Sequence, residues 1–114
     1  MSSSSDLTQF GIYLAKIYFA DKPEVFKVRP VLVIDMVNQL VLALKMSSRV
    51  RQVRVPSYIL ADWQHYGLNV PTAVLLSPLL ALPGHDLYSE RLLGVLNDQD
   101  IQSVLSGLAD LRVG

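Results

Sequence analysis

A cation stands directly in front of an aliphatic run in the segment 27–35. Arg29 and Pro30 precede residues 31–34, whose branched side chains favour a buried strand. Proline fits the first position of a strand because it cannot donate a ladder hydrogen bond. Arg29 is therefore expected at the mouth of a buried strand, where its planar guanidinium can bind two phosphate oxygens at once. The alternative is a buried strand preceded by a solvated arginine.

Positive charge is concentrated in the middle of a neutral chain. Residues 22–54 contain seven Lys or Arg and two acidic residues, whereas residues 55–114 contain two Lys or Arg and six acidic residues. Such a local field attracts phosphates and speeds their arrival. Arg49, Arg51 and Arg54 alternate within it and can follow a nucleic-acid backbone. The alternatives are a solvated loop and a field neutralised in three dimensions by the acidic C-terminal half.

The elements expected to position these residues are short strands. Strands are expected at 12–19, 30–36, 40–46, 55–60 and 72–76. Connections are expected at 20–27, 37–39 and 47–53. The first of these connections is a polar loop, and the second closes a tight hairpin over 30–46. Pro56 limits the fourth strand to a sheet edge. The stretch 78–84 breaks the strand pattern, and 87–96 is not assigned.

Two helical segments are also predicted. Residues 62–67 form one turn, with Asp62 as its N-cap and Gly67 as its left-handed stop. Asn97 or Asp98 can cap a final helix, and Asp98 and Asp100 favour its positive end. Its expected apolar face consists of Ile101, Val104, Leu105, Leu108 and Leu111. The predicted fold class is mainly β, a small antiparallel barrel with a C-terminal α-helix.

Composition narrows the class of protein. With 114 residues we expect a single domain over 11–114, after a disordered tail over 1–10. The absence of cysteine excludes disulfides and thiolate chemistry and fits a cytoplasmic location. No apolar run approaches the ~18 residues that span a bilayer, and the first residues lack the features of a signal peptide. We therefore expect no membrane partner.

Hydropathy and residue spacing bear on partners and cofactors. The hydrophobic fraction is 51% and the mean hydropathy is +0.34, so part of the apolar surface is expected to meet a second copy or another protein. The histidines and acidic residues do not cluster at ligand spacing, and the glycines are scattered singly. We therefore expect neither a metal site nor a bound cofactor.

The order of these features resembles the MazF/PemK toxins of bacterial type II toxin–antitoxin modules. The resemblance runs from about Gly11 to Leu111 and depends on several segments in a shared order. These segments are Gly11 before the first strand, Arg-Pro-Val-Leu-Val-Ile at 29–34, Met-Ser-Ser at 46–48, the stretches 58–63 and 67–74, and the glycine and acidic helix cap within 93–100.

The resemblance implies an SH3-like barrel with a C-terminal helix that forms a homodimer. It implies a metal-independent endoribonuclease that cuts single-stranded RNA, and a cognate antitoxin protein that covers the RNA groove. Operator DNA is implied only for the toxin–antitoxin complex. Arg29 matches the arginine of the family, and Ser47, or alternatively Ser48, matches its threonine or serine. The RNA-binding candidates are Lys27, Lys45, Ser48, Arg49, Arg51 and Arg54.

Metal-free RNA cleavage needs a base for the 2′-hydroxyl, an acid for the leaving oxygen and a cation for the crowded phosphorane. Arg29 suits the last role, and Ser47 can hydrogen-bond a phosphate oxygen, but neither is an obvious base. His65 and His85 can act as acid or base near neutral pH, or they are surface residues without a role. Trp63 and Tyr66 can stack on a base, or they pack their turn onto the barrel.

The chain also departs from the family pattern. Residues 76–83 carry no charge where many members have an arginine, and Gly11-Ile12 replaces the usual Gly-Asp. A second catalytic arginine therefore cannot be carried over. Two alternatives remain beside the ribonuclease: a catalytically weak or inactive member that binds RNA or DNA, and a protein-interaction module.

Overall fold

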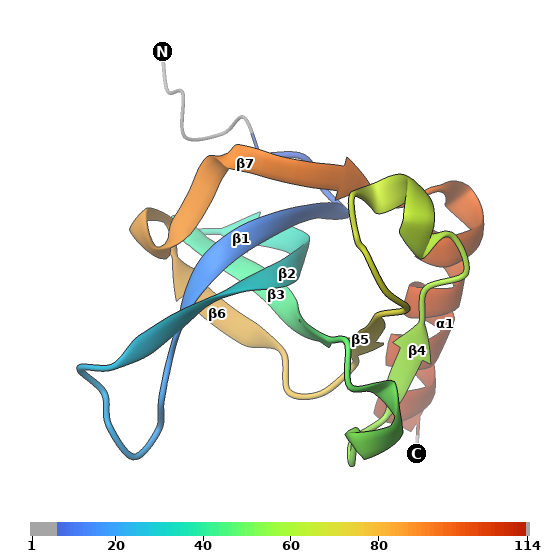
Figure 1. Cartoon of the computed structure of the whole chain (residues 1–114), viewed down its shortest axis with the longest axis horizontal. Helices are drawn as coiled ribbons and strands as arrows, with labels where there is room; N and C mark the ends of the chain where they lie inside the picture. Colours follow the sequence, from blue (N-terminus) through green and yellow to red (C-terminus); the bar gives the residue numbers. More distant parts are fainter. Residues whose placement is uncertain (1–6, 114) are drawn as a thin grey trace.

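The computed structural model describes residues 7–113 (Figure 1). Within that range the strands are β1 (Gly11–Tyr18), β2 (Phe26–Val37), β3 (Leu40–Ser47), β4 (Ser57–Ile59), β5 (Ala73–Leu75), β6 (Leu80–Pro83) and β7 (Leu87–Val95). The helices are the 3-10 segments η2 (Val50–Gln52), η3 (Trp63–Tyr66) and η4 (Gly84–Asp86), and α1 (Asp98–Val113). The predicted mainly β class with a C-terminal helix is confirmed.

The strands form one curved antiparallel sheet. Its order is β4-β5-β3-β2-β1-β7, and β6 pairs with β3 beside this path. Figure 1 shows β1, β2 and β3 crossing the middle of the molecule, with α1 behind β4. No ladder joins β4 to β7 within residues 7–113, so the barrel-like sheet stays open between its two end strands.

The β2–β3 hairpin agrees with the prediction at its turn and differs at its start. Asn38 and Gln39 have φ of 51° and 69°, values typical of the two-residue turns that match strand twist. β2 begins at Phe26, so the loop predicted to run to residue 27 is too long. The ladder between β1 and β2 continues outward to the pair Tyr18 and Phe26, and these pairs extend β2 past its proline.

Pro30 does not begin a strand, contrary to the prediction. It lies within β2 opposite Leu14, whereas the β3 partners of β2 begin only at Val31. Pro30 therefore stands where β2 is paired on one side only. A missing N–H is tolerated at such an edge.

The aliphatic run of β2 is continuous because both of its faces are buried. Leu32 belongs to a core cluster that also contains Tyr66 of η3 and Val104 of α1. Val31 and Val33 belong to a second cluster on the other face, together with Tyr13 and Leu87. The two clusters hold β2 in the centre of the sheet.

Several predicted elements need correction. β6 forms inside the stretch expected to break the strand pattern, because residues 80–83 pair with residues 40–43 of β3. β7 occupies the unassigned stretch and pairs with β1 through two register shifts. The predicted strands at 55–60 and 72–76 shorten to 57–59 and 73–75. These short ladders depend on partners far away in the sequence, which local patterns do not show.

The helical predictions hold in part. Gly67 has φ of 72°, the predicted left-handed stop, but the Asp62 side chain makes no capping hydrogen bond. Asn97 caps α1, since its Oδ1 accepts a hydrogen bond from the Asp100 N–H at 2.9 Å. Leu105 and Leu111 are exposed rather than packed, so the buried face of α1 is narrower than predicted. That face consists of Ile101, Val104 and Leu108.

The predicted N-terminal tail lies partly outside the described residues. Residues 1–6 of the tail lie outside the described residues, and Phe10 donates its N–H to the Val33 carbonyl at 2.7 Å. Among residues 7–113, no helix is both long enough and apolar enough to cross a membrane.

Candidate functional site

Three of the predicted cations share one face of the sheet. In the ladders Arg29 lies opposite Ala15, and Lys45 lies opposite Val31. Paired residues of an antiparallel sheet project to the same face, and so do residues two apart along a strand. Lys27, Arg29 and Lys45 therefore lie on the face that carries the second core cluster, just beyond its buried valines.

These cations line one cavity of about 310 Å³, which we call the cation cavity. Its other lining residues are Ile17, Phe19, Met46 and Leu75. The side chain of Lys27 reaches over an apolar wall, with Nζ 5.9 Å from the centre of the Phe19 ring. The apolar wall limits solvation while the cations supply positive potential, a combination that favours an anionic ligand.

The cations of this cavity are not paired with acids. Among the described residues the ion pairs are those of His65 with Asp62 and of His85 with Asp86. The acidic C-terminal half therefore does not form direct ion pairs with the described basic segment. Direct ion pairs within the described residues therefore do not neutralise the cations that line the cavity.

Ser47 ends β3 on the same face as Lys45, two residues earlier, but it does not line the cation cavity. Its Oγ accepts a hydrogen bond from the Arg49 N–H at 3.1 Å, a local turn typical of serine. The hydroxyl hydrogen is not used in this bond. Ser47 can therefore still donate to a phosphate oxygen.

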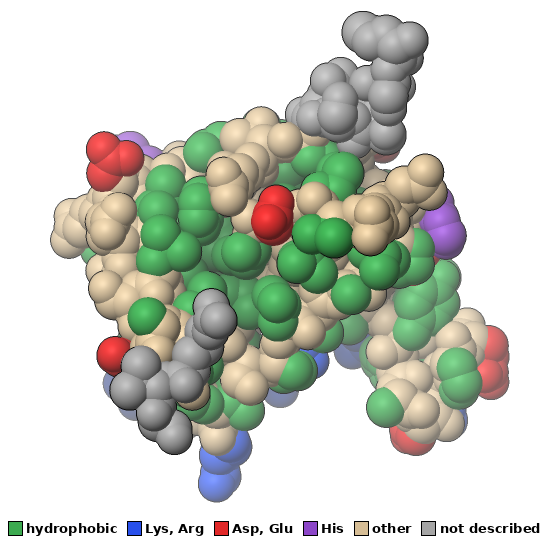
Figure 2. All heavy atoms as spheres, turned by 180° about the vertical axis from the view of Figure 1, so that it is seen from behind, with side chains coloured by type: hydrophobic (Ala, Val, Ile, Leu, Met, Phe, Trp, Pro, Cys, Tyr) green, Lys and Arg blue, Asp and Glu red, His purple; other side chains and the backbone are tan. Residues whose placement is uncertain are grey.

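The basic loop forms a second, separate hollow. Ser48, Arg49 and Arg51 line a cavity of about 470 Å³ together with Val70 and Pro71. Arg54 is exposed and lines neither cavity. Figure 2 shows the molecule from behind, and the Lys and Arg side chains seen there lie in the lower half of the view. The predicted RNA-binding residues therefore divide into the cation cavity, the loop cavity and the isolated Arg54.

The histidines lie elsewhere. His65 is exposed, with its Nδ1 atom 2.7 Å from Asp62 Oδ1, and His85 lines a cavity of about 650 Å³ beside the β2–β3 turn. Neither histidine lines the cation cavity or the loop cavity. Tyr66 is buried and Trp63 packs against the first core cluster, so the packing interpretation of these two aromatic residues is confirmed.

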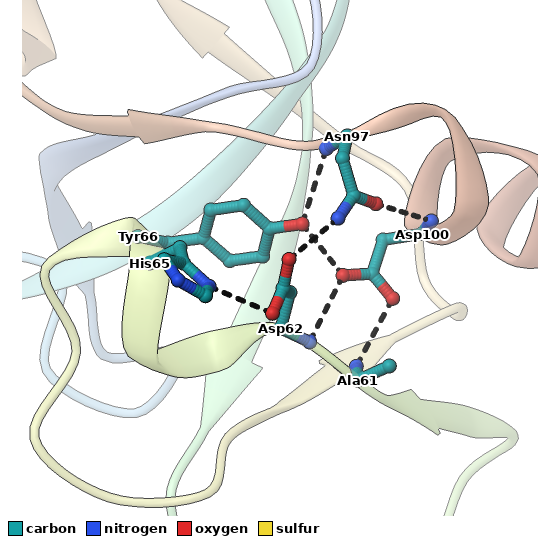
Figure 3. A network of polar contacts seen from close by, with 6 residues as sticks. All are labelled: Ala61, Asp62, His65, Tyr66, Asn97 and Asp100. Atoms are coloured by element: carbon teal, nitrogen blue, oxygen red, sulfur yellow. Dashed lines mark hydrogen bonds and ion pairs between the residues drawn. The ribbon is translucent and has the colours of Figure 1, made fainter.

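Sequence analysis missed the most highly connected polar group, the carboxylate of Asp100 (Figure 3). Asp100 is fully buried at the start of α1. Its Oδ1 accepts from the Tyr58 hydroxyl at 2.5 Å and from the Ala61 N–H at 3.0 Å. Its Oδ2 accepts from the Tyr66 hydroxyl at 2.6 Å and from the Asp62 N–H at 3.3 Å. The network therefore ties α1 to β4 and η3.

The network also determines the charge states of its members. Burial acts to raise the pKa of Asp100, but the hydrogen bonds from Tyr58, Tyr66 and the backbone outweigh it and hold that pKa below its ordinary value. Burial and the nearby carboxylate raise the pKa of Tyr58 and that of Tyr66. Asp100 is thus a buried anion held by neutral donors. The sequence shows that an acidic residue stands at the start of the helix, but it does not show that the side chain of this residue points into the core.

Comparison with known proteins is consistent with this geometry. The model of the family described as PemK-like, MazF-like toxin of type II toxin–antitoxin system matches residues 8–111. The Mycobacterium tuberculosis toxin MazF-mt6 superposes with a TM-score of 0.67 and 21% identity, covering 88% of this chain and 93% of that chain. A chain of the MazE-MazF crystal structure (Form-II) from Deinococcus radiodurans superposes with a TM-score of 0.69 and 19% identity, covering 91% and 93%. No curated protein sequence matches the chain.

Proposed function

Since the chain belongs to the PemK-like, MazF-like toxins of type II toxin–antitoxin systems, we propose that it is a metal-independent endoribonuclease. It cleaves single-stranded RNA in the cytoplasm and so inhibits growth. The observation that carries this proposal is the convergence of Lys27, Arg29 and Lys45 on one partly apolar cavity without acidic partners among the described residues.

The cavity suits cleavage by the RNA's own 2′-hydroxyl. The hydroxyl oxygen attacks the adjacent phosphorus, the bond to the 5′-oxygen breaks, and the products are a 2′,3′-cyclic phosphate and a 5′-hydroxyl. Arg29 stabilises the charge that develops on the phosphorane, and Ser47 donates to one of its oxygens. Lys27 and Lys45 bind the neighbouring phosphates.

The proton transfers are expected to be the weaker part of the catalysis. No carboxylate or imidazole lines the cation cavity, and the other lining side chains are Ile17, Phe19, Met46 and Leu75. Because cations rather than a protein base supply most of the rate enhancement, turnover is expected to be slow. Nucleotides beyond the scissile bond follow Ser48, Arg49, Arg51 and Arg54 along the basic loop.

Two protein partners belong to the same proposal. A cognate antitoxin covers the cation cavity, and operator DNA is bound only by the complex of the two proteins. A second copy of the chain covers the exposed leucines of α1, Leu105 and Leu111. Figure 2 shows hydrophobic side chains across much of the rear face, and contiguous exposed apolar surface is typical of protein–protein interaction sites. Sedimentation of the purified chain should show a dimer, and Leu105→Glu should shift it toward monomer.

The test is cleavage of a mixed-sequence single-stranded RNA in EDTA. Wild type and Arg91→Ala, which removes an exposed arginine of β7, should both cleave and leave cyclic phosphate ends. Arg29→Ala should lose at least tenfold in rate with its thermal unfolding unchanged. Equal cleavage by wild type and Arg29→Ala would reject the assignment of Arg29.

A binding module is the second candidate, and it is favoured by the uncharged stretch 76–83. In the structure this stretch contains β6, which pairs with β3 at residues 40–43 and adds no cation to the cavity. If wild type binds RNA with a salt-dependent affinity but leaves it intact in EDTA, this second candidate replaces the ribonuclease.

A further inference from the structure

The outer part of the β1–β2 hairpin stands away from the rest of the sheet (Figure 1). β7 pairs with β1 only as far as Ala15, and β3 pairs with β2 only from Val31. The ladder between β1 and β2 nevertheless continues through Lys16 to the pair Tyr18 and Phe26. Among the described residues, no third strand pairs with either edge of this two-stranded ribbon.

The two faces carry the same kinds of side chain. The inner face contributes Ile17, Phe19 and Lys27 to the cation cavity. The outer face carries residues 16, 18, 26 and 28, which alternate with the inner ones along the ladder. Tyr18, Phe26 and Val28 are 44%, 40% and 42% exposed. Tyr18 and Phe26 lie directly opposite each other in the ladder, where an aromatic pair contributes modestly to the stability of the ribbon, yet both rings stay open to solvent.

The outer aromatic rings form an open pair beside a cation. The ring centres of Tyr18 and Phe26 are 5.3 Å apart and the rings are inclined at 57°. Nζ of Lys16 lies 5.0 Å from the centre of the Phe26 ring. Exposed rings beside a lysine supply a stacking surface for a base and a charge for its phosphate.

We propose that Tyr18 and Phe26 form a base-stacking site for single-stranded RNA on the outer face of the hairpin. The site takes a nucleotide beyond those held in the cation cavity, and the strand passes around the hairpin from one face to the other. The inference rests on the proposed function, because the inner face supplies the phosphate contacts from which the strand continues. Lysine lies beside an aromatic ring on both faces, which favours nucleic acid over an apolar protein segment.

The experiment measures binding of a labelled, non-cleavable 2′-O-methyl RNA oligonucleotide to the full chain. Tyr18→Leu and Phe26→Leu keep apolar surface but remove the ring, and each should weaken binding by roughly fivefold to a hundredfold. Tyr18→Phe should bind like wild type. Leu79→Ala, which truncates an exposed leucine just before β6, is the matched control and should also bind like wild type. Thermal unfolding of each variant verifies that it is folded.

The outcomes separate this inference from the proposed function. If Lys27→Ala weakens binding while both leucine variants bind like wild type, the stacking site is rejected and the proposed function stands. If wild type does not bind the RNA even at low salt, both fail. If the leucine variants lose binding of a purified cognate antitoxin but keep that of RNA, the outer face binds protein and the inference is overturned.

Discussion

Oδ2 of Asp100 lies 2.6 Å from the hydroxyl oxygen of Tyr66, and both side chains are buried. The same hydroxyl accepts a hydrogen bond from the Asn97 N–H at 3.1 Å, and Asn97 Nδ2 donates to Asp62 at 2.7 Å. One tyrosine thereby joins the N-terminus of α1 to η3. This junction lies apart from the residues that line the cation cavity, so its loss should affect stability more than chemistry.

The first prediction concerns the buried carboxylate. Asp100→Asn replaces one acceptor oxygen by an NH₂ group, which cannot accept from the donors that now surround it. Leaving such buried donors unpaired should lower the free energy of unfolding by about 2–4 kcal/mol. Urea denaturation measures the change. Asp98→Asn, at an exposed position two residues earlier in α1, should change that free energy by less than ~1 kcal/mol. Equal effects of the two substitutions would contradict the burial argument.

The second prediction concerns pH. Because the pKa of folded Asp100 lies below its ordinary 3.8, its contribution to stability is present above that value and is lost as the pH falls through the folded pKa. The pKa values of folded Tyr58 and Tyr66 lie above the ordinary 10.0, so their contribution is present below pH 10.0 and is lost as the pH rises beyond it. Urea midpoints measured across pH should fall at both the acid and the alkaline end. Asp100→Asn should make the fall at acid pH smaller. If that fall is unchanged in the variant, Asp100 is not its cause.

The third prediction concerns the contact between β7 and η3. A Cβ on Gly94 would lie 2.7 Å from Tyr66 Cα, a backbone atom that cannot move aside alone. Gly94→Ala should therefore destabilise the fold by about 1–3 kcal/mol. Gly84→Ala is the matched control, because its Cβ would have its nearest neighbour at 3.7 Å, and it should change stability by less than ~1 kcal/mol. Thermal and urea unfolding test both, and a neutral Gly94→Ala would show that this contact is not close in solution.

The fourth prediction concerns the basic loop. Arg51 is exposed and lines the loop cavity, so Arg51→Ala should weaken binding of non-cleavable single-stranded RNA regardless of its sequence. The slope of log affinity against log salt should become shallower by about 0.7, the value for one lost phosphate contact on a single strand. Arg91→Ala should leave the slope unchanged. Equal slopes for wild type and Arg51→Ala would remove the loop from the RNA path.

The sequence by itself determined the fold class and several local features. The aliphatic run after Arg29, the β2–β3 hairpin, the stop at Gly67 and the cap at Asn97 follow from local preferences that neighbouring residues do not override. The positive charge of the middle segment was equally visible, because formal charge depends only on residue type.

The tertiary structure alone decided which of these residues meet. Strand register brings Lys27, Arg29 and Lys45 to one cavity and leaves Ser47, Arg54 and both histidines outside it. β6 and β7 form on partners distant in the chain, and Asp100 turns inward because Tyr58 and Tyr66 converge on it from elsewhere. Register and convergence are long-range properties. No local pattern of residues encodes them, which is why the basic segment was predictable and its cavity was not.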